Sequence, residues 1–421
     1  MATRQTHFRF LCGFIFIYFF AQAMSISLLA VWLHSTLRLS GTETGTVFAA
    51  NSIAAMCSQP LYGFVSDRVG TRRNILWTVA ALVALSGLFF PLVYAPLLKT
   101  NVLLGAAVGG LYLGITFIAG SYAIESYVDR IGRRDGFEYS RVRLWGSLGF
   151  ASAAAFSGRI YNVDPGINFA LASIAGLLMV MLLAAWRAGP TGADVRAKEG
   201  VRLGEALALL RMPGFWRFMV FILGVTNLYQ VFDQQFPRYF ASLFPDAQTG
   251  VAMFGYLNSV QIFLEAAGLF LAPLLVRRIG AKHGLMLAGT IMLVRIAGSG
   301  LAAGPVSISA MKLLHSVELP ILAVSIFRYI ACHFDNRFAS TVYMVGVSFG
   351  HSLGVAALSR LAGHGYDLLG FPVTYMSIAG LGLVFLVLSA FFLLPTPPET
   401  GRRAVAADTL KHQGESACPN P

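Results

Sequence analysis

The sequence predicts an all-α polytopic membrane protein with twelve transmembrane helices. The chain has 421 residues, of which 56% are hydrophobic and only 12% are charged, and its mean hydropathy is +0.68. Soluble domains are roughly 45–50% apolar and about 25% charged, so this composition excludes a soluble fold, a coiled coil, a collagen and a disordered chain. A spanning helix takes about 20 residues, or about 30–35 with its share of loop, so the length accommodates about a dozen spans.

Apolar segments recur along the chain at the spacing that twelve spans require. They lie at roughly 8–33, 45–65, 74–96, 101–126, 144–161, 166–186, 216–240, 251–275, 284–303, 307–330, 338–361 and 370–395. The first is long enough to span and has no small-residue cleavage pattern, so we expect no cleavable signal peptide.

The longest polar interruption divides these segments into six and six. We therefore expect four parts along the chain. They are an N-terminal six-helix bundle over 1–186, a cytoplasmic central loop over 187–215, a C-terminal six-helix bundle over 216–395, and a disordered cytoplasmic tail over 396–421.

The net charge of +12 is best explained by helix orientation. Of the 31 Lys and Arg residues, 23 fall on one side of the predicted spans, three fall within spans, and five fall on the other side: Arg38, Lys99, Arg159, Arg238 and Arg360. This asymmetry follows the positive-inside rule and places both termini in the cytoplasm. We expect a monomer in the cytoplasmic (inner) membrane of a bacterium, in contact with the lipid bilayer and without a nucleic-acid partner.

The cysteines do not indicate a disulfide framework or a metal site. All four, Cys12, Cys57, Cys332 and Cys418, are scattered, and no CxxC pair occurs. Those within apolar runs are expected to be small buried residues. Ser, His and Asp are present without a nucleophile motif that brings them together, so we expect no enzymatic activity, no metal and no organic cofactor.

A basic glycine turn occurs in each half. After the second span the chain reads Gly63-Phe-Val-Ser-Asp67-Arg68-Val-Gly70-Thr-Arg72-Arg73, and after the eighth it reads Leu274-Leu-Val-Arg277-Arg278-Ile-Gly280-Ala-Lys282. Glycine permits the tight turn, and the basic residues can face the cytoplasmic leaflet. The first copy resembles the signature loop of the major facilitator superfamily, with Gly63, Asp67, Arg68, Gly70 and Arg72 as its conformational residues. The resemblance implies two parallel six-helix halves that rock about a site near the membrane midplane.

Seven ionisable residues lie within apolar spans, where each costs about 2.5–3.5 kcal/mol on insertion scales. They are Glu125, Arg143, Asp233, Glu265, Arg295, Lys312 and Glu318, and His315 and His351 accompany them. Left unpaired, the seven charges would cost on the order of 20 kcal/mol, which exceeds the net stability of a protein. Four acids and three bases nearly cancel and leave one carboxyl over. A carboxyl buried without a full partner binds a proton more readily, as a proton carrier must.

Spacing suggests partners for the charges of the second half. Lys312, His315 and Glu318 step by three along one helix face, which suits either a proton relay or a charge pair beside a satisfied buried histidine. Arg295, on the preceding span, is the expected counter-charge of Glu318. Asp233 is the expected partner of Lys312.

A second group forms between the fourth and fifth spans. Glu125 ends the fourth span and Arg143 begins the fifth, across a short basic loop from 129 to 141, so the two side chains can meet. A carboxylate and a guanidinium fork match the vicinal hydroxyls of a sugar, although such a pair can also be purely structural. Phe150 lies two turns after Arg143 on the same face. It could stack on a pyranose, although a single Phe is usually a core residue.

These residues resemble the oligosaccharide:proton symporters, which include lactose, raffinose, melibiose and sucrose permeases. The resemblance extends from the first span to the twelfth. The resemblance rests on these residues: Pro60-Leu-Tyr-Gly-Phe-Val-Ser-Asp67, Glu125, Phe137-Glu-Tyr139, Arg143-Leu-Trp-Gly-Ser-Leu-Gly-Phe150, Phe232-Asp-Gln-Gln235, Arg295 and Lys312-Leu-Leu-His315-Ser-Val-Glu318. It implies that Glu125 and Arg143 bind sugar while Phe150 stacks on it. It also implies that His315, Glu318 and Arg295 carry sugar affinity and proton coupling, with the proton as the coupling ion.

Departures from the lactose-type members favour sucrose as the substrate. Those members have a galactose-binding carboxylate where this chain has Ile262, and the carboxylate here is Glu265, one turn further on. The run from Gly255 to Glu265 is similar to sucrose permease, so Gln261 and Glu265 join Glu125, Arg143, Phe150 and His315 as expected sugar ligands. Gln230 and His351 together replace a buried Asp–Lys pair, which leaves no orphan charge.

Glu125 favours a galactoside over sucrose, because sucrose permease has Asp at this position and galactoside permeases have Glu. A galactoside such as raffinose, melibiose or lactose, and also maltose, therefore stay open as substrates. Two other classes share the fold, drug/proton antiporters and non-transporting sugar sensors. Seven intramembrane charges spread over both halves disfavour the first, and the short tail disfavours the second.

Overall fold

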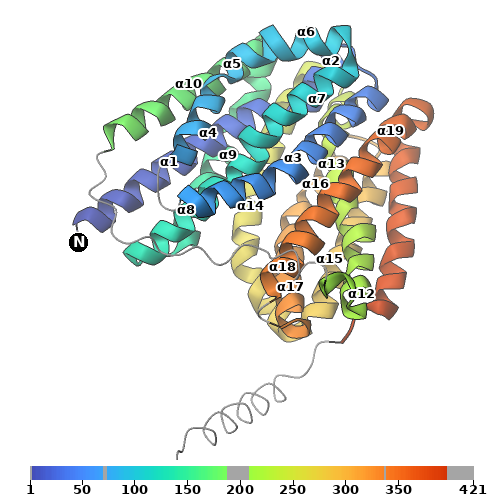
Figure 1. The fold of residues 1–421 in the computed structure, drawn as a ribbon. Coiled ribbons are helices and arrows are strands. Elements are labelled where there is room, and N and C mark those ends of the chain that lie inside the picture. The colour runs from blue at the N-terminus through green and yellow to red at the C-terminus, as the bar shows by residue number, and fades with distance from the viewer. Residues whose placement is uncertain (1, 70–73, 187–207, 336–337, 396–421) are drawn as a thin grey trace, which may run out of the picture.

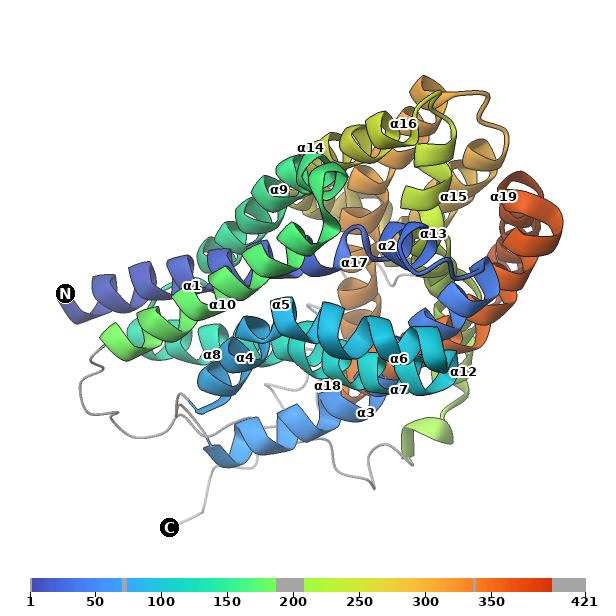
Figure 2. The same cartoon turned by 90° about the horizontal axis from the view of Figure 1, so that it is seen from above.

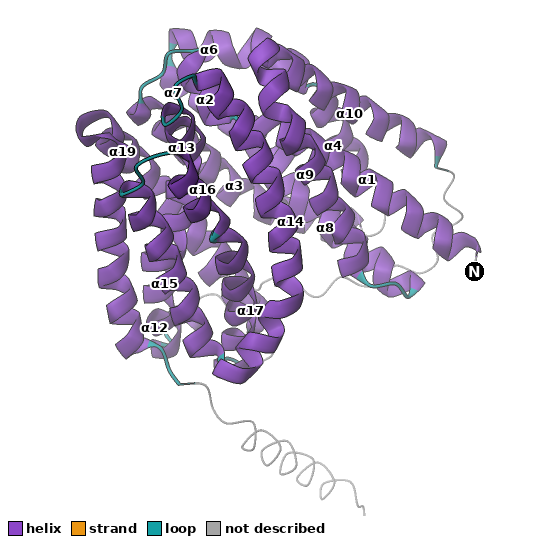
Figure 3. Ribbon diagram, turned by 180° about the vertical axis from the view of Figure 1, so that it is seen from behind, coloured by secondary structure: helices purple, strands orange, loops and turns teal. Residues whose placement is uncertain are grey.

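The computed structural model describes residues 2–69, 74–186, 208–335 and 338–395, and the helices in these ranges form twelve rods. All the elements in these ranges are helical (Figure 3). The six rods of the first half are α1 and α2 (Ala2–Ile26, Leu29–Ser35); α3 (Gly41–Val69); α4, α5, η1 and α6 (Asn74–Ala84, Ser86–Phe89, Phe90–Tyr94, Ala95–Thr100); α7, η2 and α8 (Val102–Leu113, Gly114–Ala119, Gly120–Asp135); α9 (Tyr139–Val163); and α10 (Pro165–Ala185).

The six rods of the second half follow the central segment. They are α12, η3 and α13 (Pro213–Phe221, Ile222–Thr226, Asn227–Ser242); α14 (Ala247–Ile279); α15 (Ala281–Gly300); α16 and α17 (Pro305–Leu313, His315–His333); α18, η4 and the first arm of α19 (Ala339–Thr341, Val342–Phe349, Gly350–Phe392); and the second arm of α19. Gly370 separates the two arms, because its backbone at φ 75° and ψ 173° is not helical. The prediction of twelve spanning helices is confirmed.

Eight helical stretches of the described chain are long and apolar enough to cross a membrane by length and composition alone, and one of them, Val342–Phe392, contains both arms of α19. The three rods outside this set are α3, α9 and α15. Two of these rods carry intramembrane charges, Arg143 on α9 and Arg295 on α15. Such charges lower the hydropathy by which a spanning helix is detected from composition alone.

The loop predicted from 129 to 141 is wrong, because it is largely helical. The helix α8 continues to Asp135, and α9 begins at Tyr139. Gly136 ends α8 in the left-handed region, at φ 77°, where glycine is favoured. Polar helix ends therefore extend beyond the apolar segments that sequence patterning detects.

The rods assemble into two neighbouring groups, one before residue 187 and one after 212 (Figures 1 and 2). We call the end of the molecule that holds Ala2 and Phe392 the terminal end, and the opposite end, with the turn at Gly370, the distal end. The groups contact each other mainly along α3 with α19 and α9 with α14. The central segment 187–207 and the tail 396–421 lie outside the described residues.

Polar contacts between the two groups gather at the distal end. Asp367 of α19 accepts hydrogen bonds at 2.7 Å from the backbone amides of Gly41 and Thr42 and from the Thr42 hydroxyl. It thereby caps the N-terminus of α3 from the other half. The Gln235 amide donates to the Gly41 carbonyl at 2.9 Å. The distal end is therefore closed in this structure.

Glycine permits this close approach of backbones. A Cβ atom on Gly363 would lie 2.1 Å from the Gly41 carbonyl oxygen, and one on Gly158 would lie 2.3 Å from the Val251 carbonyl oxygen. Small residues at helix crossings are how membrane helices pack without a hydrophobic driving force between them.

Replacing Asp367 with Ala should shift the two groups toward a separated distal end. The change removes three hydrogen bonds that join the groups, and we expect an effect of about 1 kcal/mol because the carboxylate is exposed. The measurement is the distance between spin labels on Lys99 and Val306, which lie on the distal ends of α6 and α16. The distribution should gain a longer component.

Asp246→Ala is the matched control. Asp246 caps α14 with bonds to Gln248 and Thr249 of its own half, so its loss should leave the distance unchanged. An unaltered distribution in Asp367→Ala would refute the role of this cap.

Candidate functional site

The ion pair expected in the first half is present. The Arg143 Nε atom lies 2.7 Å from the Glu125 Oε1 atom, and the two side chains are 34% and 23% exposed. Arg143 also donates from Nη1 to the Ser147 hydroxyl at 3.4 Å. Tyr139 interacts electrostatically with both members of the pair. The pair is thus held in place but accessible to a small polar ligand.

The aromatic ring that contacts Arg143 is that of Phe19 on α1, with its centroid 4.3 Å from the guanidinium carbon. This is cation–π distance. Phe150, which is expected to stack on a sugar from the same face of α9 as Arg143, is half-buried and packs against the apolar core. Sequence spacing indicated Phe150 because it lies on the same helix as Arg143. No spacing rule connects Arg143 to a residue of α1.

The position of Glu125 is set by a π-helical segment that α1 holds. The π-helical turn η2 directly precedes α8, which carries Glu125. The Tyr18 hydroxyl donates to the carbonyls of Thr116 and Phe117 at 2.9 and 3.1 Å, and the Gln22 amide donates to that of Phe117 at 3.0 Å. These bonds fix α8, and therefore Glu125, against α1.

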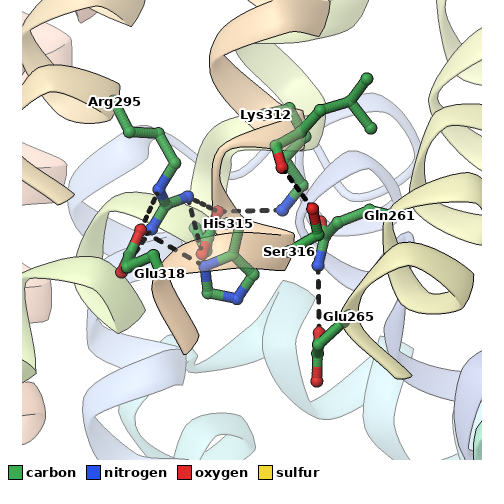
Figure 4. A network of polar contacts seen from close by, with 9 residues as sticks. Gln261, Glu265, Arg295, Lys312, His315, Ser316 and Glu318 are labelled. Atoms are coloured by element: carbon green, nitrogen blue, oxygen red, sulfur yellow. Dashed lines mark hydrogen bonds and ion pairs between the residues drawn. The ribbon is translucent and has the colours of Figure 1, made fainter. Parts of the chain in front are cut away.

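In the second half, Arg295 is the centre of a four-charge network (Figure 4). This guanidinium is fully buried and donates from Nε to Glu318 Oε2 at 2.7 Å. From Nη1 it donates to both Asp233 oxygens, at 3.0 and 3.2 Å. Lys312 Nζ donates to Asp233 Oδ1 at 3.0 Å. Two cations and two carboxylates therefore neutralise one another.

Both ion pairs expected here are present, but they are joined. Sequence reasoning paired Asp233 with Lys312 alone, whereas the structure places Asp233 between Lys312 and Arg295. The rings of Phe232 and Phe236 lie below the two cations, with centroids 4.8 Å from Arg295 and 5.2 Å from Lys312. These rings flank Asp233 on α13, so one helix face supplies both the shared carboxylate and the aromatic contacts.

His315 stands beside this network. Its Nδ1 atom lies 3.6 Å from Glu318 Oε2, which is too long for a hydrogen bond, and that nitrogen is buried without a partner. Lys312 and His315 lie on opposite sides of the junction between α16 and α17. The three residues therefore do not form one continuous stripe of contacts. Lys312 and Glu318 are linked indirectly, by the ion pairs that each forms with Asp233 or Arg295.

Glu265 is the carboxylate left without a cation in its immediate contact. Within the described chain its hydrogen bond is to the Gln261 amide nitrogen, at 3.5 Å (Figure 4). The buried Gln261 Oε1 atom has no partner. Arg143 of the other half acts electrostatically on Glu265, as do His315 and Lys312. Glu265 and Arg143 thus interact electrostatically across the boundary between the groups, where α14 packs against α9.

The signature loop is only partly described. Gly63, Asp67 and Arg68 belong to the helical backbone of α3, and Gly70 and Arg72 lie outside the described residues. The second copy is described. Gly280 has φ 84°, as the predicted glycine turn requires, and Lys282 donates to the carbonyls of Ala390 and Leu393 at 2.7 Å.

Two groups of helices with paired charges buried between apolar rods define a polytopic membrane transporter. Residues 1–405 match the family described as LacY proton/sugar symporter. The chain belongs to this family of major facilitator proteins, and it is a proton/sugar symporter rather than an enzyme or a drug/proton antiporter.

Relatives and solved structures agree with this family. The chain is 38% identical to the raffinose permease of Escherichia coli over 401 residues, which cover 94% of each chain. It is 38% identical to the lactose permease of Klebsiella oxytoca, covering 86% of this chain and 89% of the relative. It is 34% identical to the sucrose permease of Escherichia coli, covering 93% and 94%. The nucleoside transporter NupG shares the fold, with a TM-score of 0.78 at 15% identity over 91% of this chain and 98% of that one.

Replacing Asp233 with Asn should destabilise the protein by about 3–5 kcal/mol, because two buried cations would then share one carboxylate. The thermal unfolding midpoint of the purified protein in detergent measures this loss. The double variant Asp233→Asn with Lys312→Met should recover much of it, since one cation and one carboxylate remain. If the two changes destabilise additively, the charges are not a coupled network.

Proposed function

We propose that this symporter imports a disaccharide, sucrose, together with a proton. The observation that carries the proposal is that α9, which carries the Arg143 of the Glu125–Arg143 pair, packs against α14, which carries Glu265, so that Arg143 and Glu265 act on each other electrostatically. Both groups offer charged hydrogen-bond partners that a sugar can use, and a ligand that bridges the halves can bias their relative position.

The sugar site is proposed to use side chains from both groups. Glu125 and Arg143 would bind hydroxyls of one ring, and Phe150 or Phe19 would supply an apolar face. Gln261, Glu265 and His315 would bind from the other side. The unpartnered Gln261 oxygen supports this assignment, because a buried acceptor without a donor costs free energy that a ligand hydroxyl can recover.

Sucrose is proposed on the basis of the sequence around Glu265. Ile262 occupies the position where lactose-type members have their galactose-binding carboxylate, and Glu265 is the carboxylate that remains on α14. Overall identity is not higher to sucrose permease than to the raffinose and lactose permeases. A galactoside such as raffinose, melibiose or lactose is therefore the second candidate, and maltose the third.

The proton is proposed to reside on Glu318, tuned by Arg295 and His315. In this structure Glu318 is paired with Arg295 in the manner of an ionised carboxylate. Loading a proton requires that this pair open, and sugar would then bind well only to the protonated form. Coupling follows from that difference in affinity between the two states. No metal or organic cofactor is needed for such a cycle.

The charge asymmetry supports an orientation with both termini in the cytoplasm of a bacterial inner membrane. The closed distal end would then face outward, and the arrangement would be inward-facing. The exposed apolar side chains of the outer rods would contact lipid, and a single chain would carry the whole transport pathway as a monomer.

Glu318→Gln should abolish uphill sugar accumulation and retain sugar exchange. The glutamine amide cannot bind and release a proton, so sugar movement is no longer tied to net proton movement and cannot be driven uphill. Exchange needs no net proton movement and is retained. Accumulation and exchange are measured with radiolabelled sucrose in intact cells and in proteoliposomes. A variant that still concentrates sugar would show that the proton resides elsewhere.

Glu265→Gln should raise the KM for sucrose about tenfold, since it removes one charged hydrogen-bond partner. Proton-coupled uptake is compared across sucrose, lactose, melibiose, raffinose and maltose. Glu43→Gln is the matched control, because Glu43 bonds to Ser40 at the distal end and should not change KM. A strong lactose signal with none for sucrose would overturn the assignment of substrate.

A further inference from the structure

His351 is a half-buried titratable residue that the proposed cycle does not use. It is the second residue of α19, directly after the π-helical turn η4. Its ring lies against Tyr229 of α13, with centroids 5.7 Å apart and planes inclined by 26°. Among the described residues, no hydrogen bond or ion pair to His351 occurs, so its nitrogens are not committed to a fixed partner.

Tyr229 lies beside two imidazoles. Its ring centroid is also 5.6 Å from that of His315. His315 in turn has its Nδ1 atom 3.6 Å from Glu318. Four ionisable side chains therefore form a row across three rods, in the order Glu318, His315, Tyr229 and His351.

The charges around this row lie toward its Glu318 end. The carboxylates of Glu318, Asp233 and Glu265, and the phenol of Tyr122 in the other half, act electrostatically on Tyr229. On the rod of His351 the titratable neighbour toward the site is Tyr343, which lies near Tyr122 and Glu125. These carboxylates act on Tyr229, whereas no charged group of the described chain acts on His351, so the imidazole has no fixed counter-charge that would keep it protonated.

We propose that His351 is the proton-releasing residue of this symporter, reached from Glu318 through His315 and Tyr229. When Glu318 gives up its proton, His315 accepts a proton on Nδ1 and passes the one on Nε2 to the Tyr229 oxygen, while Tyr229 passes its hydroxyl proton to His351. Each middle group gains one proton and loses one, so only Glu318 and His351 change charge. Glu318 is left as the carboxylate that pairs with Arg295, and His351 releases its proton to water.

The inference rests on the proposed role of Glu318, but it predicts a separate effect on efflux and on exchange. Downhill sucrose efflux requires net proton release in each turnover, whereas equilibrium exchange does not. A relay residue must therefore affect efflux alone. A residue that only supports packing would affect both.

The test uses the full chain reconstituted in proteoliposomes, with radiolabelled sucrose. His351→Gln should slow efflux at least about tenfold, increase its solvent deuterium isotope effect and leave exchange unchanged. Tyr229→Phe keeps the ring and removes only the hydroxyl, so it should behave in the same way even if His351→Gln does not fold. The double variant should be no slower than either single one, because both interrupt one row.

His333→Gln is the matched control, because His333 also stacks on a tyrosine, Tyr329, with centroids 4.1 Å apart, but at the terminal end of α17. It should leave efflux unchanged. The inference is overturned if the His351 and Tyr229 variants keep normal efflux, or if they lose exchange and efflux equally. Failure of Glu318→Gln to uncouple accumulation would instead refute the proposed function.

Discussion

The structure depends on the cost of holding the Arg295 charge inside an apolar bundle. This guanidinium is fully buried, and two carboxylates neutralise it from two different rods. Removing such a charge from water is expensive, and only close partners with good hydrogen-bond geometry recover the cost. The network therefore ties α13, α15 and α17 together, and Lys312 extends it to α16.

The same constraint explains how a proton can control the protein. Protonation of Glu318 would remove one of the two carboxylates and leave Arg295 dependent on Asp233. Lys312 already shares Asp233, so the remaining partners would have to rearrange. A change of one charge thus becomes a change in the packing of three rods, which is the kind of two-state element that coupled transport requires.

Much of this arrangement could be predicted from the sequence, because charges in apolar spans have few possible partners. Twelve spans, the Arg295–Glu318 pair and the Glu125–Arg143 pair all follow from hydropathy and pairing. What the sequence could not reveal depends on contacts between distant rods. Phe19 meets Arg143 from α1, and Tyr18 holds the π-helical turn before Glu125 by bonding backbone carbonyls. Neither contact leaves a periodic signal, and Asp233 is shared between two cations because three rods converge on it.

Sugar is proposed to bind to the form of the protein in which Glu318 carries the proton. Infrared difference spectroscopy of the purified protein measures this directly, by following the carbonyl stretch of a protonated carboxyl group as sucrose is added. We predict a protonated-carboxyl band that grows with sucrose and is absent in Glu318→Gln. A sugar-induced band of equal size in that variant, or sucrose binding without any such band in the unaltered protein, would contradict the account.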